Sequence, residues 1–170
     1  CCVARLRACD AASASTGALA RGLHVITGGL GGLGLRVAAM LVEGGASSIS
    51  LASRGGRVAR NGPGLLAQLH MMSAIAALSA CDSSDSMDAT AHLIASPCTG
   101  VLHAAGVGDA GLLAELEAAR VQWMHASKAF GAWYLQHVAA IVPLEAHVLF
   151  SSVGSGLGNV GQANYAAGNA

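Results

Sequence analysis

The sequence feature that most limits the possible folds is a run of glycines directly after a short apolar segment. Residues 23–27 (LHVIT) precede the loop GGLGGLG, and an apolar helical pattern follows over residues 33–43. A dinucleotide pyrophosphate suits this order, because glycines allow close backbone approach and a helix amino terminus offers unpaired N–H groups. A glycine-rich turn without a ligand is the alternative. The predicted contacts are Thr27, Gly28, Gly29, Gly31, Gly32, Leu33 and Gly34.

Short apolar runs alternate with helix-like segments along the rest of the chain. This alternation predicts an α/β fold with a doubly wound, Rossmann-like parallel sheet whose ligand sites lie beyond the carboxyl ends of the strands. The expected strands are Leu23–Thr27, Ser48–Ala52, Ala74–Leu78, Gly100–His103 and His147–Ser151. The expected helices are Leu33–Glu43, Leu65–Met72, Ser86–Ala95, Leu116–His137 and one beginning at Tyr165.

The residues after the second strand indicate which dinucleotide binds. Ser53 and Arg54 stand there, with no Asp or Glu nearby to accept from the ribose hydroxyls of NAD. A guanidinium is suited to a 2′-phosphate, so we expect NADP(H), although Arg54 could also be a solvated loop residue.

Two further segments follow predicted strands. Cys81 and Asp82 come after the third strand, where the carboxylate could accept from an adenine amino group or could instead form a turn or helix cap. After the fourth strand, small residues would let the backbone pass close to a nicotinamide ribose. This last segment is His103, Ala104, Ala105 and Gly106.

Three polar residues predict carbonyl reduction. Reduction by hydride leaves an alkoxide, which a tyrosine such as Tyr165 can protonate when a nearby cation favours its phenolate form. A serine such as Ser152 can hold the carbonyl oxygen. Lys128 is the one lysine of the sequence. Each residue alone could be structural, but their order on a dinucleotide fold favours the catalytic reading.

These motifs resemble the ketoreductase domain of modular polyketide synthases and animal-type fatty acid synthases, a branch of the short-chain dehydrogenase/reductase superfamily. The resemblance covers about residues 23–170. Its motifs are ITGGLGGLG, LASRGG, ACDSSD, GVLHAAGV, SKAFGAWYL and LFSSVGSGLGNVGQANYAAGNA. Free-standing members are similar but carry Y-x-x-x-K, whereas here Asn169 stands four residues after Tyr165 and the lysine lies in the preceding helix, an exchange characteristic of the synthase branch.

The resemblance implies a role for each catalytic candidate. Tyr165 would donate the proton, Ser152 would bind the oxyanion, and Lys128 would favour ionisation of the tyrosine. Asn169 would order a water or the lysine. The resemblance also implies NADPH as cofactor, with Lys128 and Tyr165 contacting it as well. An acyl carrier protein bearing a β-ketoacyl thioester, and neighbouring synthase domains, are the implied partners.

Two departures from the family pattern leave the product configuration open. Where many members read L-D-D, this chain has Gly108, Asp109 and Ala110, and the tryptophan that marks the opposite stereochemical class is replaced by Leu157.

Composition narrows the setting in which the chain works. Nine basic residues balance nine acidic ones, which gives no electrostatic case for a nucleic-acid groove or a membrane surface. An odd count of five cysteines, without metal-binding spacing or a secretory signal, indicates reduced thiols and a cytoplasmic compartment, although an organellar location stays possible.

We expect residues 1–22 to form a linker and residues 23–170 to form a partial catalytic domain. The chain begins with Cys1 rather than Met, which favours the interior of a longer polypeptide. The resemblance implies that a sixth strand, a lid helix and a seventh strand follow Ala170, so the fold would be truncated at its carboxyl end. The alternatives are a free-standing 3-oxoacyl-carrier-protein reductase and a synthase domain that binds NADPH without reducing.

Overall fold

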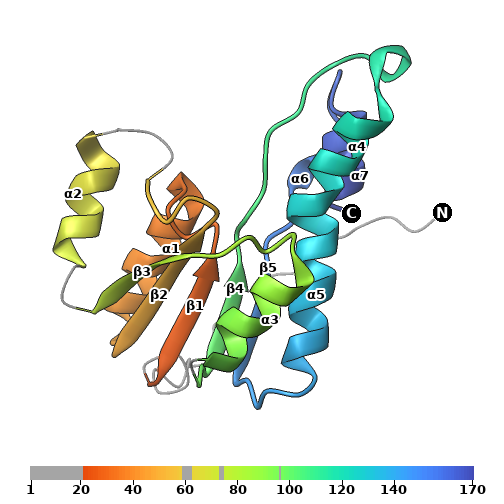
Figure 1. The fold of residues 1–170 in the computed structure, drawn as a ribbon. Coiled ribbons are helices and arrows are strands. Elements are labelled where there is room, and N and C mark those ends of the chain that lie inside the picture. Colours follow the sequence, from red (N-terminus) through yellow and green to blue (C-terminus); the bar gives the residue numbers. More distant parts are fainter. Residues whose placement is uncertain (1–20, 59–62, 73–74, 96) are drawn as a thin grey trace, which may run out of the picture.

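Five parallel strands form one sheet in the order β3-β2-β1-β4-β5 (Figure 1). The computed structural model describes residues 21–58, 63–72, 75–95 and 97–170. The strands are β1 (Leu23–Thr27), β2 (Ser48–Ser53), β3 (Ala76–Ala80), β4 (Gly100–His103) and β5 (Ala146–Leu149). Strand β1 therefore lies at the centre, and the doubly wound arrangement predicted from the sequence is confirmed.

Helices cover both faces of this sheet. Helices α1 (Gly32–Glu43) and α2 (Pro63–Met71) lie on one side, and α3 (Ser86–Ala95) and α5 (Gly131–Ala139) lie on the other (Figure 1). Successive side chains of a strand point to opposite faces, so both faces of the central strands carry apolar residues. This burial of both faces explains the apolar runs from which the strands were predicted.

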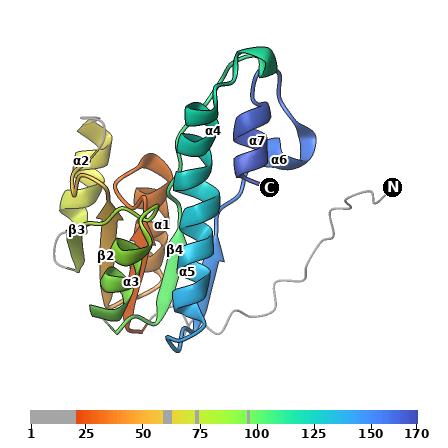
Figure 2. The ribbon, with the colours of Figure 1, turned by 45° about the vertical axis from the view of Figure 1, so that its right-hand side comes forward.

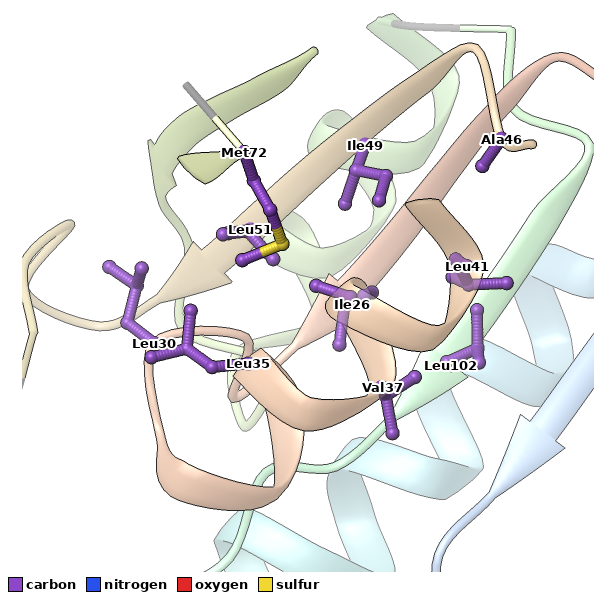
Figure 3. Packing of buried hydrophobic residues seen from close by; sticks show 11 residues of the cluster. Ile26, Leu30, Leu35, Val37, Leu41, Ala46, Ile49, Leu51, Met72 and Leu102 are labelled. Carbon is purple, nitrogen blue, oxygen red and sulfur yellow. The ribbon is translucent and has the colours of Figure 1, made fainter. Parts of the chain in front are cut away.

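The larger core cluster lies between the sheet and α1. Ile26 of β1 and Leu102 of β4 pack there with Leu35 of α1 (Figure 3). The neighbouring strand residues Val25 and Val101 face the other way and pack with residues of α3 and α5. This double packing holds the two central strands, and thus the loops at their carboxyl ends.

One helix is longer and less regular than the sequence suggested. Helix α4 (Ala118–His125) continues through a π-helical turn, η2 (Ala126–Phe130), into α5, so that the whole helix extends two residues beyond the expected end at His137. Figure 2 shows α4 and α5 as one long element, with two short helices beside α4. These are α6 (Val153–Leu157) and α7 (Ala163–Gly168), and α7 begins two residues before Tyr165.

Three strand ranges differ from the expectation, and two short elements were not expected. Strand β2 ends at Ser53 rather than at Ala52. Strand β3 begins at Ala76 rather than at Ala74, which lies outside the described residues, and β5 ends at Leu149 rather than at Ser151. The sequence did not predict α6, which contains two glycines, or the 3₁₀ turn η1 (Leu113–Glu115).

The expected linker lies almost wholly outside the described residues, which begin at residue 21. Among the helices that the structure describes, none combines the length and apolar character needed to cross a membrane.

Candidate active site

A pocket of about 380 Å³ opens at the carboxyl ends of the strands. It is formed by the loops after β1, β2, β3 and β4, and by Ser127 of the π-helical turn. In open parallel sheets this is the usual place for a ligand. The lining residues are Gly28, Leu30, Gly31, Ser53, Arg54, Gly55, Arg57, Val58, Cys81, Asp82, Ser83, Ala104, Ala105, Gly106, Val107 and Ser127.

The glycine loop is packed too closely for side chains. Gly28 has a φ of 68°, and a Cβ atom there would lie 2.5 Å from the backbone of Ala105. A Cβ atom on Gly34 would lie 2.5 Å from the carbonyl oxygen of Gly28. At Gly32, by contrast, nothing lies within 4 Å of such an atom, so the start of α1 is open. This open helix start leaves backbone N–H groups available to an anion.

The predicted cofactor contacts divide into three groups. In the glycine loop after β1, Gly28 and Gly31 line the pocket, while Gly29 and Gly34 pack against neighbouring backbone. The last group, Gly32 and Leu33, is exposed and does not line the pocket.

Thr27 and His103 form a buried pair instead of lining the pocket. Their side chains are 2% and 1% exposed, and the Thr27 hydroxyl lies 2.6 Å from Nδ1 of His103. The structure therefore gives both residues an internal role and leaves the pocket wall to Ala104, Ala105 and Gly106.

Two guanidinium groups stand at the end of β2. Arg54 and Arg57 are both exposed and both line the pocket, together with Ser53. Sequence reasoning assigned a phosphate contact to Arg54 alone. The remaining arginine of that segment, Arg60, lies outside the described residues.

Asp82 shapes its own turn as well as lining the pocket. Its Oδ1 accepts hydrogen bonds from the backbone N–H and the hydroxyl of Ser84, at 3.0 and 2.6 Å. The cap of α3 is a different residue, Asp85, whose Oδ1 accepts from two N–H groups of the first turn. Burial, with nearby Asp88, Asp82 and Asp85, raises the pKa of the Cys81 thiol to about 11, so Cys81 lines the pocket as a neutral group.

Lys128 extends from the π-helical turn toward the ends of β4 and β5. Its Nζ donates to the carbonyl oxygen of Phe150 at 2.9 Å. A Cβ atom on Gly106 would lie 2.4 Å from Cε of Lys128, so the lysine passes directly over this glycine. Burial lowers the pKa of Lys128 from its usual value. The ammonium group is thus held at the backbone of Phe150, which precedes Ser152 by two residues in the sequence.

Ser152 and Tyr165 both lie close to Gly154. A Cβ atom on Gly154 would be 3.4 Å from Oγ of Ser152 and 3.8 Å from Cε1 of Tyr165. Oγ of Ser152 accepts from the N–H of Gly154 at 3.1 Å and caps α6. Because a hydroxyl that accepts a hydrogen bond keeps its own proton, Ser152 can still donate to a carbonyl oxygen.

Asn169 closes the short helix that carries Tyr165. Its Nδ2 donates to the carbonyl oxygen of Tyr165 at 2.8 Å, and its backbone carbonyl accepts from the hydroxyl of Ser151. Its Oδ1 is buried without a hydrogen-bond partner among the described residues. A buried acceptor of this kind is suited to a water molecule.

A charged network that sequence reasoning missed ties α7 to α4. Asp109 accepts from Nε of Arg120 at 2.7 Å through Oδ1, and from Nδ2 of Asn164 at 2.7 Å through Oδ2. Gly111 N–H adds a bond of 2.7 Å to the carbonyl of Gly161. Because Asn164 directly precedes Tyr165, this network fixes the start of the helix that presents the tyrosine.

Other pocket residues were also missed by sequence reasoning. Arg57 could have been found from its closeness to Arg54, but Ser127 could not, because its position depends on the π-helical turn. The remaining missed residues are Leu30, Gly55, Val58, Ser83 and Val107.

Comparisons with known proteins show the family of the chain. The family model described as the KR domain matches residues 22–170. The chain is 43% identical over 154 residues to the polyketide synthase GfsA of Streptomyces halstedii, a match covering 88% of this chain and 2% of that synthase. It is 38% identical over 151 residues to the erythronolide synthase EryA2 of Saccharopolyspora erythraea, covering 87% and 4%.

Solved structures extend the likeness to the fold. A structure of A-type ketoreductases from a modular polyketide synthase is 36% identical, with a TM-score of 0.77, and the match covers 88% of this chain and 33% of that chain. The chain thus spans 33% of that solved ketoreductase and only 2% and 4% of the two synthases.

The Asp109 network gives a pH-dependent contribution to stability. The hydrogen bond from Asn164, aided by the charge of Arg120 and opposed by burial, holds the pKa of Asp109 below its usual range. The stabilisation is therefore present above the unfolded-chain pKa of about 3.9 and is lost as the pH falls through the lower folded-chain value. We expect Asp109→Asn to be less stable than the wild type at pH 7, with the difference closing below about pH 4.

Urea unfolding at a series of pH values measures this difference. The control is Glu115→Gln, which removes one charge from an exposed position in the same segment. A stability gap for Asp109→Asn that stays constant from pH 7 to pH 3 would contradict the role given to the ionised carboxylate.

Proposed function

The chain belongs to the KR domain family, as its motifs predicted, and on this premise we propose that it reduces a carrier-tethered β-ketoacyl thioester with NADPH. The product is the β-hydroxyacyl thioester. The proposed partners are an acyl carrier protein that delivers the substrate and neighbouring domains of a synthase. The observation that carries the proposal is that Ser152 and Tyr165 both lie close to Gly154, just after the strand end at which Lys128 is held.

The residues around the pocket fit a nicotinamide dinucleotide. The glycine loop brings backbone to the pocket wall without side chains, and the exposed Gly32 marks an open helix start that suits a pyrophosphate. Arg54 and Arg57 stand where a 2′-phosphate would be bound, with Ser53 beside them. Two cations at this position favour NADPH over NADH.

When bound, the cofactor would supply a hydride to the β-keto carbon of the thioester substrate. The side chains of this chain handle the oxygen and its proton. Ser152 donates a hydrogen bond to the carbonyl oxygen, and Tyr165 donates the proton that converts the developing alkoxide to an alcohol. Lys128 favours the phenolate that remains, because a nearby positive charge stabilises a negative one. The phenolate then regains a proton from solvent.

Asn169 and the π-helical turn hold this arrangement. The side chain of Asn169 bonds to the backbone of Tyr165 and leaves a buried oxygen that can bind a water. Such a water would extend the route by which Tyr165 recovers its proton. Proton transfer depends strongly on distance, so the contacts that hold Tyr165 in place are expected to affect turnover.

Tyr165→Phe tests the proton donor. The change removes one hydroxyl, so we expect kcat for β-keto thioester reduction to fall by about 10²- to 10⁴-fold while NADPH binding changes by less than about twofold. NADPH consumption measures the first quantity and NADPH fluorescence the second. Tyr134→Phe, the same change at the other tyrosine, is the control, because Tyr134 packs against the core between the sheet and α5. Near-normal turnover of Tyr165→Phe would refute the assignment.

Arg54→Ala tests the cofactor preference. Only NADPH carries the 2′-phosphate, so we expect its dissociation constant to rise about 10- to 100-fold, while that of NADH changes by less than about twofold. Titration of cofactor fluorescence measures both constants. Arg57→Ala shows how far the second guanidinium shares the contact, and Arg36→Ala on the exposed face of α1 is the control. If Arg54→Ala raised the dissociation constants of NADPH and NADH equally, Arg54 would have a structural role and no specific contact with the 2′-phosphate.

A further inference from the structure

The helix that carries Lys128 changes its hydrogen-bond pattern where the lysine stands. Lys128 is the middle residue of the π-helical turn Ala126–Phe130. Such turns are rare, cost favourable helical geometry, and are frequent at functional sites. No proline occurs between residues 118 and 139 to force the irregularity. The contacts around the turn must therefore stabilise it.

One buried side chain reaches this turn from the sheet. His103, at the end of β4, has its Nε2 3.3 Å from the backbone carbonyl oxygen of Lys128. A Cβ atom on Gly131, the first residue after the turn, would lie 2.9 Å from Cε1 of the same ring. The imidazole thus fills the space under the turn, and glycine is required where the ring comes closest.

The hydrogen-bond partners determine where the proton of His103 lies. A backbone carbonyl can only accept, so Nε2 of His103 must be the donor to Lys128. In the neutral ring Nδ1 is then an acceptor, and the hydroxyl of Thr27, 2.6 Å away, donates to it. Thr27 sits at the end of β1, directly before the glycine loop. The three residues form one directed chain of hydrogen bonds.

The neutral form of His103 is maintained by its surroundings. Burial lowers the pKa of His103 to about 4, and the positive charge of Lys128 acts in the same direction. His147 of β5 is the other titratable group that acts on this ring and also opposes its protonation. At neutral pH the ring therefore keeps one tautomer and one set of partners.

The two ends of Lys128 are held separately. His103 holds its backbone carbonyl, while Phe150 accepts from its Nζ at 2.9 Å. Between them the side chain passes over Gly106, where a Cβ atom would come within 2.4 Å of Cε. A shift of the turn would move the origin of the side chain, so the turn limits whether the ammonium group can reach the carbonyl of Phe150.

We propose that His103 is a positioning residue that fixes the π-helical turn through the carbonyl of Lys128, and so sets the place of the Lys128 ammonium at the backbone of Phe150. This inference rests on the proposed function, in which Lys128 favours ionisation of Tyr165. Because His103 also accepts from Thr27, it connects Lys128 to the glycine loop that would bind the cofactor.

Two substitutions of His103 test the proposal. His103→Leu fills the volume without a donor, whereas the terminal amide of His103→Gln can still donate to the carbonyl of Lys128. We expect His103→Leu to lower kcat by about 10- to 100-fold with KM and NADPH binding within about twofold. We expect His103→Gln to recover kcat to within about threefold of the wild type.

The pH dependence of kcat separates positioning from a general loss of structure. If the lysine is displaced, its charge no longer lies where the proposed mechanism uses it, so the pH dependence of kcat should change in His103→Leu and should not change in His103→Gln. His24→Leu is the control, since it removes a buried imidazole from β1 outside the site and should leave the profile unchanged.

The results for the two His103 variants distinguish a positioning role from a structural one. If His103→Leu matches the wild type in kcat and in pH profile per folded molecule, the positioning role is wrong. Equal losses in both variants with an unshifted profile would make His103 merely structural, which also overturns the proposal. A wild-type protein that binds NADPH but reduces no β-keto thioester would instead overturn the proposed function, and the inference with it.

Discussion

The pairing of β1 on both of its edges is the constraint on which the rest of the structure depends. At the carboxyl end of this strand Thr27 pairs with Ala52 of β2 and with His103 of β4. The backbone then continues the connection, because Gly29 N–H donates to Ala52 at 3.0 Å and Ala104 N–H donates to Thr27 at 2.9 Å. The loops after three parallel strands are thereby held at one edge of the sheet. The pocket between them can form only because glycine permits the close approach of these backbones.

The two halves of the site are built in different ways. The half that would bind the cofactor is made largely of main chain, and its shape follows from the register of β1, β2 and β4. The half proposed to carry the catalytic groups depends on side-chain contacts between short elements: Asp109 ties α7 to α4, Asn169 closes α7, and Lys128 reaches from the π-helical turn to the end of β5. Small changes in these contacts would move the reacting groups, whereas the pocket is fixed by the sheet.

The sequence predicted most of the fold because the central strands are buried on both faces. Strands β1 and β4 have the expected bounds, since their apolar runs end where glycine or small residues begin. The family was identified from the resemblance of several motifs, of which the most specific was Asn169 four residues after Tyr165 with Lys128 in the preceding helix. Helix α6 was not predictable from propensity, because two of its five residues are glycine and its cap, Ser152, was assigned only a catalytic role.

The π-helical turn could not be foreseen either, because nothing in its sequence, ASKAF, differs from an ordinary helix. Its cause lies in the tertiary contact with His103, a residue predicted to line the pocket and found instead beneath the turn. The sequence predicted which residue types the site needs, but the residues that position them depend on contacts between elements far apart along the chain. Asp109 and Asn164 are a second example, separated by 55 positions.

The central claim is that this domain transfers hydride from NADPH to a β-keto thioester. Its most direct test supplies NADPH deuterated at both C4 positions of the dihydronicotinamide together with a β-ketoacyl thioester, and examines the product by mass spectrometry. The account predicts a β-hydroxyacyl thioester that carries one deuterium on the carbinol carbon. Recovery of the unreduced thioester from a protein that binds NADPH, or a hydroxyl product without deuterium at that carbon, would contradict it.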